Sequence, residues 1–325
     1  MKAIARITAL AFSVLASLTP TLAYAQGDYP RKPIHVVLGF SAGGVTDVLA
    51  RALAGRLAEL LSVPVLVENR PGANGNIAAE YVVKAPDDGY TLLYNTSAVI
   101  LDPLLGVKVP FDVFSDLSAI SLTQNVPLVL AIHPSVPAAN VQDFAAYARA
   151  NPGKLNYASA GAGNVTHLGT LLFLRATAIT ATHIPYKGAA EALVSVSGGH
   201  TQFFFNSIGV TVPYFKDNRL KGLAVTSTKR IMAIPDVPTL DETVAPGFNL
   251  GVWAGVMAPA KTPASIIRKL GSEIIKALQY PDVLAAFAAQ TAEVKGSTPE
   301  EYGAFLRDER TRWAEIIASA GLKRD

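Results

Sequence analysis

A strand, a glycine loop and a helix follow one another within residues 34–61, and this pattern strongly constrains how the chain folds. The apolar run 34–40 predicts a strand, residues 41–47 contain paired glycines, and the apolar positions after them have helical spacing. Glycines let the backbone turn with its N–H groups outward, and a helix N-terminus adds unpaired N–H groups and a positive dipole end. The pattern therefore predicts an anion-binding loop, with Thr46 or Asp47 capping the helix.

Short apolar runs and helical patterns alternate along most of the chain. The runs 63–67, 90–94, 128–132 and 201–205 predict strands, and helical patterns separate them. This alternation predicts an α/β fold with mixed, mainly parallel sheets flanked by helices. Ligands bind at the carboxyl ends of strands in such sheets. The loops after residues 40 and 94 are therefore expected to share one crevice.

A second glycine loop, residues 159–167, has the same plan as the first. It reads Ser-Ala-Gly-Ala-Gly-Asn-Val-Thr-His, against Ser-Ala-Gly-Gly-Val-Thr-Asp at 41–47. Chance similarity among small residues is the alternative explanation. The shared order of strand, loop and helix favours two anion-binding loops, which we name cradle 1 (41–47) and cradle 2 (159–167). Two facing lobes with one cradle each would hold a small molecule at both ends.

The N-terminal segment 1–25 is typical of a cleavable signal peptide. Lys2 and Arg6 precede a mostly apolar stretch, and Ala23-Tyr24-Ala25 matches the small-x-small pattern before a cleavage site. We expect cleavage after Ala25 and a periplasmic location. A retained membrane anchor is the alternative, and the shortness of the apolar stretch disfavours it. The chain has no cysteine, which excludes a lipid-modified lipoprotein and disulfides.

The charge of the mature chain bears on its partners. Residues 1–25 contain two bases and no acids, so their removal lowers the formal net charge from +3 to +1. A nearly neutral chain with no block of basic residues argues against nucleic-acid binding.

Enzymatic and metal chemistry are both weakly indicated. Gly39-Phe40-Ser41-Ala42-Gly43 matches the nucleophile elbow of serine hydrolases. However, it follows the first strand of the mature chain, and no glycine-rich oxyanion segment precedes it. The five histidines are scattered without metal-ligand spacing, and the phosphate-binding and dinucleotide-binding motifs are absent. We therefore expect no metal and no cofactor.

Many short motifs resemble one family, the periplasmic solute receptors of tripartite tricarboxylate transporters (Bug or TctC-type proteins). They cover the mature chain in order: Tyr29-Pro30 to Pro33, Phe40 to Asp47, Val67 to Asn76, Asp88-Gly89-Tyr90-Thr91-Leu92, Asn151-Pro152-Gly153-Lys154-Leu155-Asn156-Tyr157, Val165-Thr166-His167-Leu168, Ile184-Pro185-Tyr186-Lys187-Gly188, Leu223-Ala224-Val225-Thr226-Ser227, Pro235-Asp236-Val237-Pro238-Thr239-Leu240 and Pro299-Glu300-Glu301. The resemblance implies a non-enzymatic receptor with a two-lobed, type II periplasmic binding fold. It places lobe 1 at 26–125 and 227–325, and lobe 2 at 126–226.

The resemblance also implies a ligand site between the lobes. One ligand carboxylate would meet cradle 1 through Phe40, Ala42, Gly43, Gly44 and Asp47. The other end of the ligand would meet Thr96, Ser97, Ser159, Gly163, Thr166 and His167. Ser41, Gly161, Tyr186 and Asn206 complete the predicted set. The implied partners are a small carboxylate and integral membrane subunits similar to TctA and TctB, and we expect a monomer.

The sequence departs from the family pattern at two places, and the first of them bears on which class of ligand is bound. Phe204-Phe205-Asn206-Ser207 stands where the family usually has Met-Phe-Asp-Asn, and Leu101-Asp102-Pro103 where it tends to have Ile-Asn-Pro. The neutral Asn206 removes a carboxylate that could pair with a ligand amine, which favours a di- or monocarboxylate over an amino acid. A receptor that reports its ligand to a signalling partner remains an alternative to transport.

Overall fold

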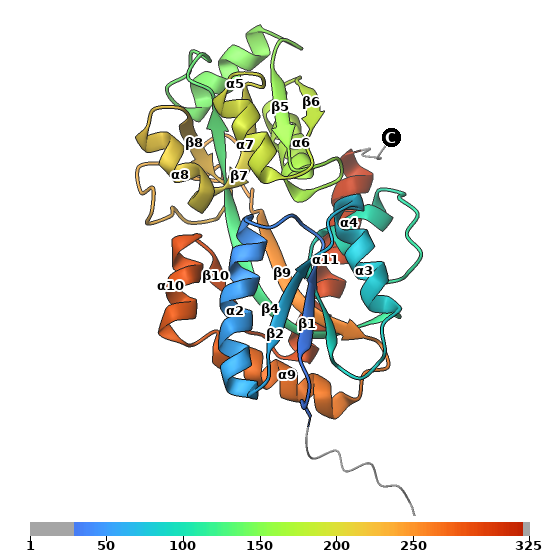
Figure 1. The fold of residues 1–325 in the computed structure, drawn as a ribbon. Coiled ribbons are helices and arrows are strands. Elements are labelled where there is room, and N and C mark those ends of the chain that lie inside the picture. Colours follow the sequence, from blue (N-terminus) through green and yellow to red (C-terminus); the bar gives the residue numbers. More distant parts are fainter. Residues whose placement is uncertain (1–28, 321–325) are drawn as a thin grey trace, which may run out of the picture. The chain divides into compact units, whose positions relative to one another are not determined.

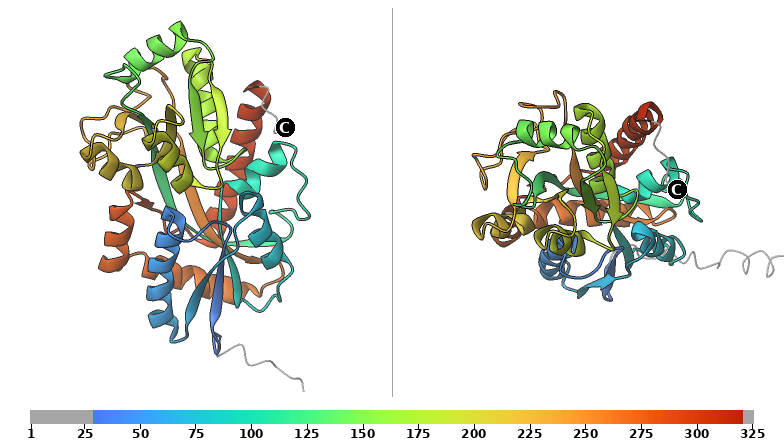
Figure 2. Two further views of the ribbon diagram at one scale, coloured as in Figure 1. Left: turned by 45° about the horizontal axis from the view of Figure 1, so that its top comes forward. Right: turned by 90° about the horizontal axis from the view of Figure 1, so that it is seen from above.

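The computed structural model describes residues 29–320, and the signal peptide predicted at 1–25, with its cleavage site, lies outside them. Of the described residues, 32–320 belong to one compact unit. Within it the strands build two sheets that share one strand, β4 (Leu117–Ile132), which runs from one sheet into the other (Figures 1 and 2). We call the sheets with their helices lobe 1 and lobe 2, and so the predicted two-lobed α/β fold is confirmed.

Lobe 1 is built on the strand order β2-β1-β3-β9-β4, with β10 paired to β4. β1 is parallel to β2 and β3, whereas β9 is antiparallel to β3 and β4. Its elements are β1 (Ile34–Leu38), α2 (Val45–Leu61), β2 (Val65–Asn69), η1 (Ala73–Gly75), α3 (Asn76–Val83), β3 (Thr91–Thr96), α4 (Ala98–Leu104), β9 (Gly251–Pro259), α9 (Ala264–Ala277), α10 (Pro281–Ala289), β10 (Glu293–Val294) and α11 (Pro299–Ala320).

Lobe 2 is built on the second half of β4, with β7, β5 and β6 on one side and β8 on the other. β5 is parallel to β6 and β7, and β4 is antiparallel to β7 and β8. Its elements are α5 (Val141–Ala150), β5 (Asn156–Ser159), α6 (Val165–Thr177), β6 (Thr182–Pro185), α7 (Ala189–Ser197), β7 (Phe203–Ser207), α8 (Ile208–Lys216) and β8 (Lys221–Val225).

The sheets are mixed as predicted, but antiparallel pairing is more prominent than the sequence indicated. Parallel pairs occur where a helix returns the chain to the same edge, between β1 and its neighbours and between β5 and its neighbours. All pairings of β4 and β9 are antiparallel, both with each other and with β3, β7, β8 and β10. Only the last five residues of β4, 128–132, were predicted as a strand from the sequence.

The amphipathic pattern of α2 explains how cradle 1 is fixed to lobe 1. Leu49, Leu53, Leu57 and Leu61 recur every four residues, and all four are buried against the sheet. Burying a leucine side chain contributes about 1.5–3 kcal/mol relative to leaving it exposed. The helix ends at Ser62, whose φ of 55° is left-handed. The N-terminus of α2 is thereby held at the carboxyl end of β1.

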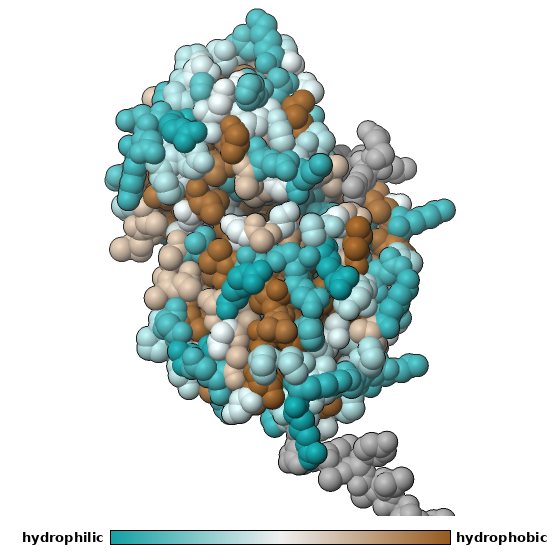
Figure 3. Space-filling model, viewed as in Figure 1, coloured by the Kyte–Doolittle hydropathy of each residue, from teal (hydrophilic) through white to brown (hydrophobic). Residues whose placement is uncertain are grey.

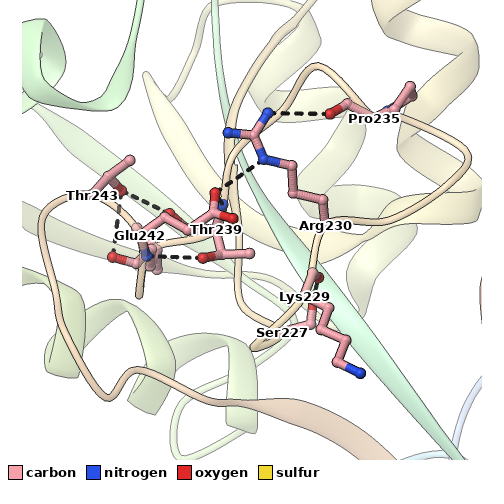
Figure 4. Close-up of polar contacts among 8 residues, drawn as sticks. Ser227, Lys229, Arg230, Pro235, Thr239, Glu242 and Thr243 are labelled. Carbon is pink, nitrogen blue, oxygen red and sulfur yellow. Dashed lines mark hydrogen bonds and ion pairs between the residues drawn. The ribbon is translucent and has the colours of Figure 1, made fainter.

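The segment between β8 and β9 stays with lobe 2. Val225 bridges Thr239, and the Leu250 N–H donates to the Thr226 carbonyl at 3.0 Å. The loop is also tied to itself, because Arg230 donates to Glu242 at 3.0 Å and Glu242 bonds back to Thr239 (Figure 4). The chain re-enters the first sheet at Gly251, the first residue of β9.

The surface carries several exposed large apolar side chains. Val48 of α2 is 37% exposed and Leu66 of β2 is 45% exposed. On the face viewed in Figure 3, apolar residues near α2 and β2 lie among polar ones. No described helix is long and apolar enough to cross a membrane.

Candidate functional site

A cavity of about 710 Å³ lies between the start of cradle 1, of which Ser41 lines it and Ala42, Gly43, Gly44 and Asp47 do not, and the loops at the carboxyl ends of β5 and β6. Lobe 1 lines it with residues from the loops after β1 and β2, and lobe 2 with residues after β5 and β6 and at the start of α7. The lining residues are Gly39, Phe40, Ser41, Pro71, Gly72, Ala73 and Asn74 from lobe 1, and Ala160, Gly161, Ala162, Pro185, Tyr186, Lys187 and Glu191 from lobe 2.

Cradle 1 has the geometry of an anion-binding loop. Gly43 has a φ of +84°, which glycine adopts without the steric cost of a Cβ atom. α2 begins at Val45, and its N-cap is Gly44. The predicted cap at Thr46 or Asp47 was wrong, because both residues are already helical. No side chain caps this helix within the described residues, so its first N–H groups have no side-chain acceptor.

Hydrogen bonds to the buried carboxylate of Asp47 hold cradle 1 in place. Its carboxylate is 4% exposed and accepts hydrogen bonds from the Gly43 N–H at 3.0 Å, the Asn69 amide at 2.9 Å and Arg51 at 3.1 Å. Burial acts to raise the pKa of Asp47, but these hydrogen bonds and the Arg51 charge outweigh it and hold the pKa below its usual range. Asn69 also donates to the Phe40 carbonyl at 2.9 Å. These contacts fix the loop to β2.

Cradle 2 repeats this backbone in lobe 2. Gly163 has a φ of +78°, and its N–H donates to His167 Nδ1 at 3.1 Å, as Gly43 donates to Asp47. α6 begins at Val165 after the N-cap Asn164, whose Oδ1 accepts the Thr166 N–H at 3.1 Å. The similarity between the two sequences therefore reflects a similarity in conformation. The caps differ, because Asn164 closes the N-terminus of α6 whereas Gly44 leaves that of α2 open.

Cradle 2 rests on a stack of aromatic rings. The rings of His167 and His183 lie parallel with centroids 3.8 Å apart, and the centroid of the Tyr157 ring lies 4.9 Å from that of His183 and 6.1 Å from that of His167. His183 Nε2 and the Ser159 hydroxyl are 2.7 Å apart. Burial lowers the pKa of His183 to about 4, so the imidazole is neutral at pH 7. His183 was not among the predicted site residues, because nothing in its spacing connects it with His167.

Ser159, Thr166 and Gly161 build the loop itself. The Thr166 hydroxyl accepts the Ala160 N–H at 2.9 Å, and the Ser159 hydroxyl accepts the Gly161 N–H at 3.2 Å. Ser159 is fully buried. Of these three residues, Gly161 is the one that lines the cavity.

Thr96 and Ser97 lie deeper in lobe 1, and both are buried. Thr96 borders a narrow cavity of about 10 Å³ next to Phe40 and Asn74. Ser97 is the N-cap of α4. Neither side chain lines the large cavity.

Tyr186 and Asn206 lie near cradle 2. Tyr186 lines the cavity, and its hydroxyl is 2.5 Å from that of Ser195. Asn206 is 1% exposed, and its Nδ2 has no hydrogen-bond partner among the described residues. Because Ala158 of β5 pairs with Phe204 of β7, Asn206 lies two residues further on, next to the start of cradle 2.

Other lining residues were not predicted. The loop 71–74 contributes four of them, and Lys187 and Glu191 contribute the charges. The dense turn after β2 was visible in the sequence, but its position opposite cradle 2 was not. Among residues 29–320 there is no group of three or more side chains suited to hold a metal ion.

Comparison with known proteins agrees with this geometry. A family model described as the tripartite tricarboxylate transporter family receptor matches residues 49–322. BugT of Bordetella pertussis is 37% identical over 297 residues, which cover 91% of each chain. The chain belongs to this receptor family.

Solved structures of similar proteins extend the comparison. A protein of R. palustris determined with adipate is 31% identical, with a TM-score of 0.87 over 91% of this chain and 99% of that chain. MatC of Rhodopseudomonas palustris with bound malate is 29% identical, with a TM-score of 0.83 over 89% of this chain and 100% of that chain. The periplasmic binding protein BugD is 31% identical, with a TM-score of 0.85 over 91% of this chain and 100% of that chain. The matched family is one of receptors, not of enzymes. The serine hydrolase alternative is thereby excluded.

Proposed function

We propose that this receptor binds a small carboxylate in the cavity between its lobes and delivers it to integral membrane transporter subunits. The observation that carries the proposal is the open N-terminus of α2, which follows the left-handed Gly43 and the residues Gly39, Phe40 and Ser41 that line a cavity of about 710 Å³. Unpaired N–H groups at a helix N-terminus favour an anion. The similar proteins determined with adipate and malate support the same class of ligand.

The neutral side chain of Asn206 favours a ligand acid that has no amino group. A neutral amide next to cradle 2 cannot neutralise a ligand ammonium group, whereas its Nδ2 can donate to a hydroxyl or carboxylate oxygen. Malate and aspartate form a matched pair for this choice, because they differ only in a hydroxyl against an ammonium group. We propose that malate binds more tightly than aspartate.

A thermal-shift screen followed by calorimetry tests the proposal on the protein from Gln26 onward. Ligand at 100 times its dissociation constant adds about 2.7 kcal/mol to the free energy of unfolding. We expect adipate or malate to raise the melting temperature, and dimethyl adipate, which lacks the charges, to leave it unchanged. A chain that responds to none of a panel of mono- and dicarboxylates would contradict the proposal. Tighter binding of aspartate than malate would contradict only the role of Asn206.

Export is tested separately. We propose that the full chain is cleaved after Ala25 and released into the periplasm, as its signal-like segment and its periplasmic relatives suggest. N-terminal sequencing of the periplasmic fraction is expected to begin at Gln26. Recovery of the uncleaved chain in the membrane fraction would favour the anchor instead.

A further inference from the structure

A direct hydrogen bond joins the two lobes at the edge of the cavity. Asn164 Nδ2 of cradle 2 donates to Asn74 Oδ1 of lobe 1 at 3.2 Å. The same Asn164 side chain caps α6 through its Oδ1, so the orientation of its amide group is fixed, with Oδ1 towards the helix and Nδ2 towards lobe 1. A movement of lobe 2 away from lobe 1 would break this bond, while the cap would move with its own helix.

The loop that carries Asn74 has an unusual backbone. Gly72, Ala73, Asn74 and Gly75 all have positive φ angles, of 131°, 45°, 55° and 95°. Ala73 and Asn74 lack the freedom of glycine, and such conformations cost about 1–3 kcal/mol each. The turn also packs closely on Gly39, where a Cβ atom would lie 2.3 Å from the Gly75 Cα. This close packing holds the turn 72–75 in its left-handed conformation.

Asp102 of α4 sets the direction of the Asn74 amide. Its side chain is fully buried, Oδ1 accepts Asn74 Nδ2 at 3.1 Å, and Oδ2 accepts Asn76 Nδ2 at 2.5 Å. A carboxylate only accepts hydrogen bonds. The amide nitrogen of Asn74 must therefore face Asp102, and its carbonyl oxygen must face Asn164. A neutral amide at position 102 would not impose this choice.

We propose that Asp102, Asn74 and Asn164 form a latch between the lobes that increases ligand affinity from outside the anion-binding loop. Asn74 and Asp102 are positioning residues in this scheme. The latch forms only when the lobes approach, so it raises the fraction of molecules in the closed, binding-competent form, and affinity scales with that fraction. The expected effect of the latch on ligand affinity rests on the proposed function, whereas its expected effect on the positions of the lobes does not.

The test variant is Asn74→Gly, because glycine accepts the left-handed backbone while removing the amide. Asn218→Gly is the matched control, since Asn218 is an exposed asparagine with a φ of 54° at the end of α8, away from the cavity. With malate and adipate as probes, calorimetry is expected to show about fivefold weaker binding for Asn74→Gly, which corresponds to about 1 kcal/mol at 1.4 kcal/mol per tenfold. Asn218→Gly is expected to bind as the wild type does.

Lobe positions are measured without any ligand. The chain has no cysteine, so spin labels attached through Gln142→Cys on α5 and Arg268→Cys on α9, both exposed, report one distance between the lobes. Asn74→Gly is expected to broaden this distance and shift it to larger values. An unchanged distance distribution, or equal affinities for wild type and Asn74→Gly, would overturn the latch. If the wild type binds no carboxylate, the proposed function fails, and the spin-label distances still decide on the latch.

A second pair of substitutions checks the contact itself. Asn74→Cys with Asn164→Cys is expected to be joined by a short bifunctional maleimide, which spans more than the Cβ separation of about 3.5–4.5 Å that a disulfide needs, and faster with bound malate or adipate than without. The chain has no competing thiol. Failure to cross-link while both thiols remain reactive would contradict the contact.

Discussion

Gly43 and Gly163 occupy the same place in the two lobes, and their N–H groups both donate to the side chain four residues later. The two cradles nevertheless differ in their side chains. Cradle 1 has Gly44 at the cap and a buried, ionised Asp47 behind it, whereas cradle 2 has Asn164 at the cap and His167 behind it. The same backbone is thus left open for an anion in lobe 1, but in lobe 2 it is closed by Asn164, which bonds across to lobe 1. Two loops of similar sequence and conformation can therefore have different roles.

Asp47→Ala is expected to have the largest effect, because it removes the acceptor of three donors beneath cradle 1. We expect the free energy of unfolding to fall by about 3 kcal/mol and malate affinity to be lost. Urea denaturation measures the first and calorimetry the second. Asp143→Ala is the matched control, since Asp143 holds the same helical position in α5 but is exposed. Equal losses from both would contradict the importance of the buried network.

Gly44→Asn transfers the cap of cradle 2 to cradle 1. The substitution is sterically possible, because a Cβ at Gly44 would meet its nearest atom, the Ser41 carbonyl oxygen, at 3.8 Å. A new side-chain bond to the Thr46 N–H would stabilise the helix by only a few tenths of a kcal/mol but take a donor from the ligand. We expect dicarboxylate affinity to fall about tenfold.

Gly55→Asn on the exposed side of α2 is the control for this transfer, because a Cβ there meets nothing within 4 Å. Unchanged affinity in Gly44→Asn would show that the N-terminus of α2 does not bind the anion.

Acid is expected to destabilise the contacts of lobe 2 at a higher pH than those of lobe 1. The folded pKa of His183 is lowered to about 4, so the unfolded chain binds a proton near pH 6.5 that the folded chain does not. Stability therefore falls as pH drops from 6.5 towards 4. The pKa of Asp47 is also lowered, and its contribution is lost only below its ordinary value of 3.8.

The measurement is the melting temperature at pH 7 and pH 5, in wild type and in His183→Gln. We expect a fall of a few degrees between the two pH values in the wild type and a smaller fall in the variant. The same fall in both proteins would assign the acid sensitivity to other groups.

Asn164→Gly is expected to have the smallest effect on stability, a few tenths of a kcal/mol, because glycine is also acceptable at an N-cap. Its effect on ligand affinity should match that of Asn74→Gly, since each removes one side of the same bond. The double variant should bind no more weakly than either single one. Additive losses in calorimetry would show that the two asparagines act independently.

Much of the fold could be predicted from the sequence. The apolar runs and glycine loops located both cradles, because each combines a strand, special backbone angles and a helix within about 25 residues. The N-cap of α2 was misplaced by two or three residues, since Thr46 and Asp47 are common capping residues and Gly44 is not distinctive. Contacts between distant segments were missed, namely His167 with His183 and Asn74 with Asn164. Nothing local in the sequence reveals them.

The division into lobes stays a prediction, and the contacts suggest one change to it. Residues 227–250 were assigned to lobe 1, yet Thr239 and Leu250 bond to the end of β8 and to Thr226. The Thr226 hydroxyl accepts the Leu128 N–H at 2.8 Å and donates to the Leu250 carbonyl at 2.6 Å. We propose that the second crossing lies at Leu250, next to the first crossing in β4.

The shared strand β4 also sets an order of strand pairing as the chain emerges, N-terminus first, into the compartment where it folds. Lobe 2 has all its strands once residue 225 has emerged, whereas β9, which separates β3 from β4 in lobe 1, ends only at Pro259. Until β9 arrives, the first half of β4 is an unpaired edge with buried-type side chains, a template for wrong pairing between chains. We therefore expect the partly emerged receptor to be exposed to wrong pairing in the half that will later hold the open anion cradle.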